Sequence, residues 1–276
     1  MTEPTVDAHV HVWDTSRREL PWLPVGHALR RDISLADFRV AAEGDVPEIV
    51  LVQADADPGE VFDLLDQAAA DDAVLGVVGW VDLLADDVEK KLAKALSYAE
   101  DRGARLVGIR CPPADQHDPE AVTAPAYVRG VRAAADAGLA VDLLLRPAAL
   151  TGAARLAALV PGARLVLDHL GNPTTADDTW VTGMKALADV PSVTVKVSGV
   201  TAHLPAGELA ELLDFALDQF GSDRLMFGSD WPVCTLRSSR AETVRRTTAV
   251  LPVAAHKDVF RGTARRTYRL EVTAGR

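Results

Sequence analysis

The stretch VDAHVHVWD, residues 6–14, places Asp7, His9 and His11 at every second position near the start of the chain. A period of two is typical of a β-strand, in which alternate side chains point to opposite faces. We therefore expect these three polar residues to lie on the inner face of the fold. The apolar residues that alternate with them should face the helices: Val6, Ala8, Val10 and Val12. A nucleotide-binding doubly wound sheet would require a Gly-rich phosphate-binding loop after this strand, and the sequence has none there.

Seven further segments of the chain are predicted strands, and most of them are near-continuous apolar runs. Such runs are typical of strands buried on both faces, as in parallel sheets. Amphipathic segments lie between them, for example 58–72, 86–103 and 207–221. This alternation predicts a single (β/α)8 TIM barrel over residues 1–276, with an open doubly wound sheet as the alternative. The eight predicted strands are 5–12, 48–54, 74–81, 105–111, 139–145, 164–169, 193–199 and 224–230.

Composition argues against several classes of protein. The chain has 276 residues and a formal net charge of −11, and its densest basic segment is confined to residues 261–270, so we expect no nucleic-acid partner. We also expect no membrane partner, because no apolar run is long enough to cross a bilayer, and the N-terminus does not resemble a secretion signal. Cys111 and Cys234 are far apart in the sequence and indicate a reducing, cytoplasmic location. The expected partner is a small-molecule substrate; whether the chain forms a homo-oligomer is left open.

The long segment 13–34 contains Trp13, Trp22 and two prolines, and it is too irregular for a helix. Long loops after barrel strands often serve as lids or binding loops. We expect this one to do both, with part of it packing on the barrel rim and part forming a pocket wall.

The candidate catalytic residues lie at predicted strand ends. Asp168 and His169 end the segment LVLDH, and Asp230 ends LMFGSD, while His9 and His11 belong to the first strand. In a barrel these ends meet at the C-terminal mouth, where barrel enzymes keep their active sites. Two buried histidines could be satisfied by hydrogen bonds alone. However, three histidines and an aspartate that converge from three strands indicate chemistry, because an isolated buried charge is costly.

Taken together, several segments resemble the amidohydrolase superfamily, in its amidohydrolase-2 branch: VDAHVHVWD, VVGWVDL, LVGIRC, VLDHLGNP, VTVKVSGV and DRLMFGSDWPV. Within that branch they are most similar to the lactonases related to L-fuconolactonase, L-rhamnonolactonase and 2-pyrone-4,6-dicarboxylate lactonase. The resemblance implies a distorted (β/α)8 barrel of the amidohydrolase type. It also implies that the active site consists of His9, His11, His169 and Asp230.

The predicted fifth strand departs from the pattern of metal-dependent members of the superfamily. It reads VDLLLR, with neither the lysine that bridges two metals nor the histidine that binds a single metal in many members. The resemblance therefore implies at most one divalent ion, held by His9, His11 and Asp230. Zinc is the ion expected from this set of nitrogen and oxygen ligands. The sequence leaves open whether the enzyme is metal-independent.

The chemistry expected of this site is the hydrolysis of a lactone ring. Asp230 is the predicted general base that activates water, with His9, His11 and His169 stabilising the oxyanion. The alternative is a metal-dependent decarboxylase of an aromatic or unsaturated acid, and a third hypothesis is a binding or scaffold protein without activity. The expected substrate-binding residues are Arg110, Trp80, Asp82 and Trp13.

Two of these assignments have structural alternatives. Arg110 could instead form a salt bridge with a carboxylate of the barrel, and Trp13 could serve packing alone. Asp142 and Lys196 are interpreted as a structural pair inside the barrel.

Overall fold

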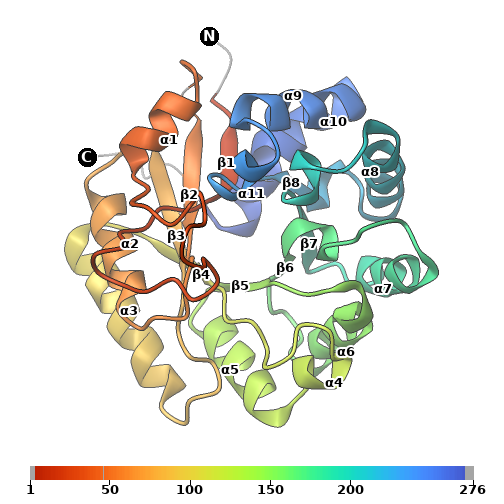
Figure 1. Cartoon of the computed structure of the whole chain (residues 1–276). Coiled ribbons are helices and arrows are strands. Elements are labelled where there is room, and N and C mark those ends of the chain that lie inside the picture. The colour runs from red at the N-terminus through yellow and green to blue at the C-terminus, as the bar shows by residue number, and fades with distance from the viewer. Residues whose placement is uncertain (1–3, 46, 271–276) are drawn as a thin grey trace.

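The computed structural model describes residues 4–45 and 47–270, and its centre is a barrel of parallel strands. Eight strands pair in sequence order, each parallel to the next. All eight predicted strands are confirmed, and the doubly wound alternative is wrong because the sheet curls round until β1 lies beside β8 (Figure 1). The strands are β1 (Val6–Val10), β2 (Glu48–Val52), β3 (Val74–Gly79), β4 (Leu106–Ile109), β5 (Ala140–Leu143), β6 (Leu165–Leu167), β7 (Val193–Val197) and β8 (Leu225–Phe227).

The barrel closes through the segment that follows β8. The amide of Asp230 donates to the carbonyl of His9 at 2.9 Å, and the amide of His11 donates to the carbonyl of Trp231 at 2.8 Å. These two bonds join the first strand to the end of the last one. As a result, the histidines of β1 and the aspartate after β8 lie on adjacent segments.

Helices form the outer layer and cover the strands (Figure 1). Segments 58–72, 86–103 and 207–221 are confirmed as helices α2, α3 and α8, and α3 ends at Gly103, whose φ of 66° is left-handed. The α-helices are α1 (Leu35–Ala41), α2 (Glu60–Ala69), α3 (Val88–Arg102), α4 (Pro119–Val122), α5 (Pro125–Asp136), α6 (Leu150–Leu159), α7 (Asp178–Ala188), α8 (Ala206–Phe220), α9 (Arg240–Val250), α10 (Val253–Lys257) and α11 (Thr263–Thr267). Short turns of 3-10 helix follow several strands, and Asp258–Gly262 forms a π-helical turn.

The faces of β1 differ from the prediction in one respect. Strand pairing with β2 shifts register between Asp7 and Val10, which marks a β-bulge. Because a bulge adds a residue, it reverses the alternation of faces. Before the bulge, Val6 and Ala8 point into the barrel, where they pack in a cluster with Val50, Val52, Val78, Val107, Ala140, Val166 and Met226. The expectation that Asp7 faces inward with the histidines is therefore wrong.

Asp7 instead serves the outer wall of the barrel. Its carboxylate pairs with Arg240 of α9 at 3.1 Å and accepts the amide of Ser229 at 2.7 Å. After the bulge, Val10 and Val12 join the outer hydrophobic core. His9 and His11 are thus left on the inner side, as predicted.

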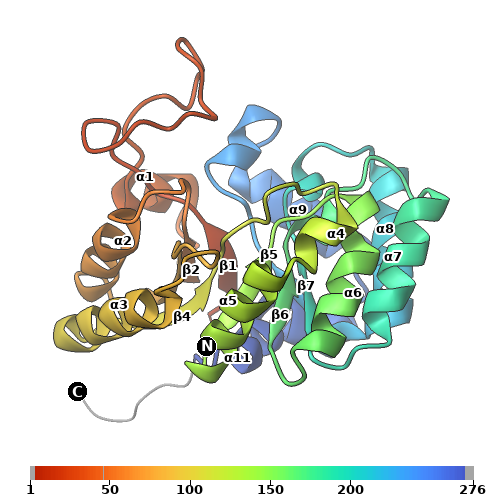
Figure 2. The same ribbon diagram turned by 90° about the horizontal axis from the view of Figure 1, so that it is seen from below.

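The two ends of the barrel are closed differently. At one end α11 and the residues after it cover the interior, with Tyr268 and Leu270 in the inner cluster. At the other end the loop between β1 and α1 projects well beyond the strands (Figure 2). No helix among residues 4–45 and 47–270 has both the length and the apolar character needed to cross a membrane.

Candidate active site

A cavity of about 620 Å³ opens at the carboxyl ends of the strands. Several of its lining residues lie at or just after a strand end, and the others come from the surrounding loops. Those used below are His11, Trp22, Gln53, Arg110, Leu144, Asn172, His169, His203 and Asp230. This cavity therefore lies at the end of the barrel where the sequence predicted the active site.

His11 and Asp230 form the centre of the cavity floor. The Nδ1 of His11 lies 2.8 Å from the carbonyl oxygen of Val52, which can only accept a hydrogen bond, so Nδ1 carries the proton. The lone pair of Nε2 is then free, and this atom lies 3.4 Å from Oδ1 of Asp230. The Nε2 of His9 lies 3.8 Å from the same oxygen. Both histidines of β1 thus face the carboxylate after β8.

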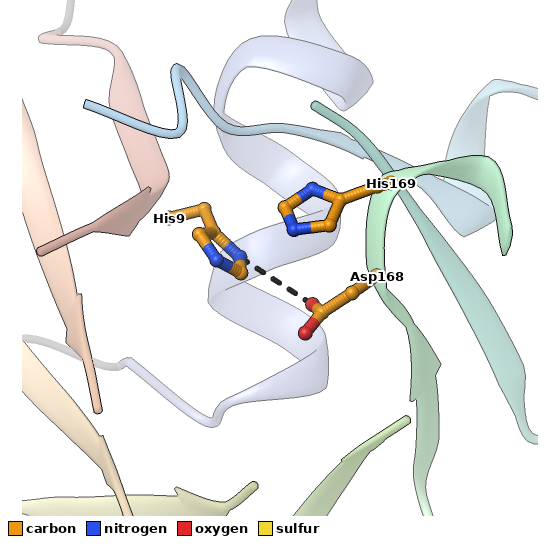
Figure 3. Close-up of side chains that lie close together, drawn as sticks. All are labelled: His9, Asp168 and His169. Atoms are coloured by element: carbon orange, nitrogen blue, oxygen red, sulfur yellow. Dashed lines mark ion pairs between the residues drawn. The ribbon is translucent and has the colours of Figure 1, made fainter. Parts of the chain in front are cut away.

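His169 and Asp168 join this group from the end of β6. Figure 3 shows both residues facing His9, and the dashed line marks the contact between His9 Nδ1 and Asp168 Oδ1, at 3.4 Å. The backbone of His169 has a φ of 57°, which turns its side chain across the barrel mouth. Its Nδ1 lies 2.8 Å from the hydroxyl of Ser198, at the end of β7, which orients the ring.

Two glycines make room for these rings. A Cβ at Gly228, directly after β8, would lie 2.5 Å from the Cβ of His9. A Cβ at Gly199, whose φ is +62°, would lie 2.8 Å from the ring of His169. Real Cβ atoms do not approach so closely, so both positions require glycine for the histidines to sit as they do.

Burial and neighbouring charges set the protonation of the group. Burial, with Lys196 nearby, lowers the pKa of His9 well below its usual value, and burial also lowers the pKa of His169. Burial alone would raise the pKa of Asp230, but His169, His11 and Arg110 more than offset it and hold that pKa below its usual value. At neutral pH His9 and His169 are therefore neutral and Asp230 is ionised.

Two sets of side chains in the described chain could hold a divalent ion: His9, His11 and Asp230, or His9, Asp168 and His169. In each set the ligand atoms lie within 4.8 Å of one another. In donor type the first set matches a catalytic zinc, because nitrogen and carboxylate oxygen are its usual ligands. The free lone pair on His11 Nε2 supports this fit. Strand β5 contributes to neither set, and the residue that follows it, Leu144, lines the cavity.

Arg110 lies in the cavity wall, as expected of a substrate-binding residue. It also forms a salt bridge with a carboxylate of the barrel, which was the alternative role. Its Nη1 is 3.3 Å from Asp168 Oδ2, and its Nη2 donates to the carbonyl of Gln53 at 2.5 Å. The predicted pair of Asp142 and Lys196 is confirmed, at 2.5 Å inside the barrel.

The structure does not bring Trp80, Asp82 or Trp13 to the cavity. Trp80 packs on the outer core and, with Asp82, lines a separate pocket between α2 and α3. The physical reason is that β3 ends at Gly79, so the chain has already turned toward the helices at these positions. Trp13 is buried in the loop 13–34, where its indole N–H donates to the carbonyl of Arg31 at 2.7 Å.

Other residues occupy the places that the sequence assigned to these three. Trp22, at 43% exposure, lines the cavity and rests edge-on against Trp13. The loop 13–34 is thus part packing and part pocket wall, as predicted. His203, Gln53 and Arg146 also line the cavity. Ser198 directly follows the end of β7, and that position was the signal that could have identified it.

Comparison with known proteins places the chain among amidohydrolases. The model of the amidohydrolase family matches residues 6–270. An L-fucono-1,5-lactonase from Burkholderia multivorans is 33% identical, with 96% of each chain covered. A second L-fucono-1,5-lactonase, from Burkholderia ambifaria, is 33% identical over 84% of this chain and 81% of its own. A crystal structure of a Burkholderia multivorans amidohydrolase with bound zinc has 30% identity and a TM-score of 0.87, covering 98% of this chain and 100% of its own.

Proposed function

The chain belongs to the amidohydrolase family, and from this premise we propose that it opens the ring of a sugar lactone, with Asp230 as the general base. The observation that carries the proposal is Asp230 in the cavity wall, its pKa held below the usual value and its carboxylate facing His9 and His11 at 3.8 and 3.4 Å. The similarity to two L-fucono-1,5-lactonases supports lactones as the substrate class.

The residues of the cavity supply each step of ester hydrolysis. Asp230 takes a proton from water as the water oxygen bonds to the lactone carbonyl carbon. The guanidinium of Arg110 and the ring of His169 stabilise the negative charge on the carbonyl oxygen. The ring C–O bond then breaks, and Asp230 returns the proton to the departing alkoxide. The product is the open-chain hydroxy acid, with one water consumed.

A divalent ion held at His11 and Asp230 would polarise the carbonyl or lower the pKa of the attacking water. The roles given above to Asp230, Arg110 and His169 do not depend on it. Lactones are reactive esters, so an aspartate base with a cationic oxyanion site is a sufficient apparatus for opening them.

The cavity walls fit a neutral sugar ring. Trp22 offers an aromatic surface on which the C–H face of the ring can stack, and polar side chains such as Gln53 and Asn172 can bind its hydroxyls. The loop after Gly171 reads NPTTADD and contains no basic residue that would select a second carboxylate. Together with the similarity to two L-fucono-1,5-lactonases, this favours an aldonolactone over a dicarboxylate lactone.

The test compares Asp230→Asn with the wild type on a panel of aldonolactones, using a pH indicator to follow acid release. Asparagine tolerates the φ of 57° at this position, so the variant should fold. We expect kcat to fall by about 100- to 10,000-fold, the usual contribution of a general base. Asp214→Asn, an exposed position on α8, serves as the control. Wild-type protein that opens no lactone, or an Asp230→Asn variant with unchanged kcat, would refute the proposal.

A further inference from the structure

A buried lysine lies directly beneath the catalytic group. Lys196 of β7 is 0% exposed, and its ammonium contacts three acceptors. These are Asp142 Oδ2 at 2.5 Å, Asp168 Oδ1 at 3.2 Å and His9 Nδ1 at 3.0 Å. An ammonium can only donate hydrogen bonds; that of Lys196 bonds Asp142 and His9, and Asp168 lies within ion-pair distance. The carboxylate of Asp142 is itself held in place, because the Tyr268 hydroxyl lies 2.8 Å from both of its oxygens.

A second cation faces the opposite side of the His9 ring. Nη1 of Arg110 lies 3.2 Å from His9 Nε2, and it also contacts Asp168. Guanidinium groups, like ammonium groups, only donate hydrogen bonds. Each nitrogen of His9 therefore lies next to an obligatory donor.

This arrangement opposes metal binding through His9. A metal at Nε2 needs the lone pair of that nitrogen, which forces the proton onto Nδ1, where it would point at the Lys196 ammonium. The metal would also have to displace Nη1 of Arg110. Metal-bound histidines usually donate their second N–H to a carbonyl or carboxylate. His11 meets that requirement through Val52, whereas Lys196 lies closer to Nδ1 of His9 than Asp168 Oδ1 does, at 3.4 Å.

We propose that Lys196 is a positioning residue that holds His9 out of the metal coordination sphere. His11 and Asp230 then bind a divalent ion without His9, and weakly. His9 remains a hydrogen-bonding member of the site. The inference concerns the same site as the proposed function, but metal affinity tests it without any turnover, so the two can fail independently.

The experiment measures the zinc affinity of the full chain by competition with a chromophoric chelator. His9→Ala in the wild type should leave the Kd for zinc unchanged. The double variant Asp142→Asn/Lys196→Met removes the buried ion pair, and His9 Nδ1–H can then donate to Asp168. This variant should bind zinc about tenfold more tightly or better, the usual range for residues that support a metal ligand. Adding His9→Ala to the double variant should abolish the gain.

Tyr268→Phe is the matched control, since it removes a contact to Asp142 while keeping the ammonium; its zinc affinity should equal that of the wild type. A loss of zinc affinity of about tenfold or more in the single variant His9→Ala would overturn the inference, because His9 would then be a ligand. The zinc affinity of the single variant His9→Ala therefore tests the inference even if the double variant does not fold. Unchanged zinc affinity in a folded double variant would equally overturn it.

Discussion

Glu60 offers a quantitative test of how the wall of the cavity is held. It is the first residue of α2 and is 0% exposed. Its two carboxylate oxygens accept the amides of Ala54 at 2.9 Å and Asp55 at 3.1 Å. Both residues line the cavity just after β2. The Glu60 side chain thus holds the backbone of the cavity-lining loop after β2 in place.

Burial raises the pKa of Glu60 from 4.5 to about 7, although the two amides, Arg18 and Arg110 act against the rise. A raised pKa means that the folded state keeps a proton which the unfolded chain releases at lower pH. The resulting stability is fully present below pH 4.5 and is lost as the pH rises through about 7. The difference corresponds to about 3 kcal/mol of unfolding free energy, of which about 2.5 kcal/mol is lost between about pH 5 and 8.

The assay is urea unfolding followed by circular dichroism at several pH values, for the wild type and Glu60→Gln. Glutamine does not titrate, so the free energy of unfolding of the wild type minus that of the variant should fall by about 2.5 kcal/mol from pH 5 to pH 8. Subtracting the variant removes the contributions of all other groups. Glu208→Gln, at an exposed position of α8, should show no such change. A difference for Glu60→Gln that is constant with pH would refute the reasoning.

Three further predictions concern the site itself. Gly228→Ala should push His9 from its place and lower kcat by about 100-fold, whereas Gly207→Ala, where a Cβ meets nothing, should leave kcat unchanged in the same lactone assay. Trp22→Ala should raise KM for a sugar lactone by about five- to tenfold with kcat unchanged, while an equal effect on a small lactone without a sugar ring would contradict stacking. Because the pKa of Asp230 is lowered and both His9 and His169 stay neutral, kcat/KM should be flat from about pH 6 to 8 once spontaneous opening is subtracted; a steep rise across that range would exclude Asp230 as the base.

The sequence was sufficient for the barrel because its strands are marked by composition alone. Strands buried on both faces are apolar throughout, and helices between them are amphipathic, so each pattern is local and readable. The positions of His169 and Asp230 followed from the same logic, since both come within three residues of the end of an apolar run. What failed were positions that depend on one or two residues of register. Asp7 lies outside because of a bulge in β1, and Trp80 turns outward because β3 ends one residue before it.

The loops were beyond prediction for a different reason. Trp13 and Trp22 belong to the same irregular segment, and nothing local distinguishes the one that packs from the one that lines the cavity. Their roles are set by tertiary contacts, such as the pairing of Trp13 with Ile33 and the edge-on contact between the two indoles at 5.5 Å. The double role of Arg110, in the cavity wall and in a salt bridge, likewise depends on distances to Asp168 on another strand.

The orientation of Asp230 shows how closing the barrel also builds the site. Its φ of 57° is unfavourable for a residue other than glycine and persists only where the surroundings fix it. Here the amide of Asp230 donates to His9, and its carbonyl accepts the amide of Cys234 at 2.9 Å. The first of these bonds is also one of the two that join β1 to the segment after β8. The contact that closes the barrel therefore holds Asp230 in the turned conformation that points its carboxylate at His11. A change that loosens this junction should reduce activity before it unfolds the protein, because the turned backbone depends on the junction more directly than the apolar core does.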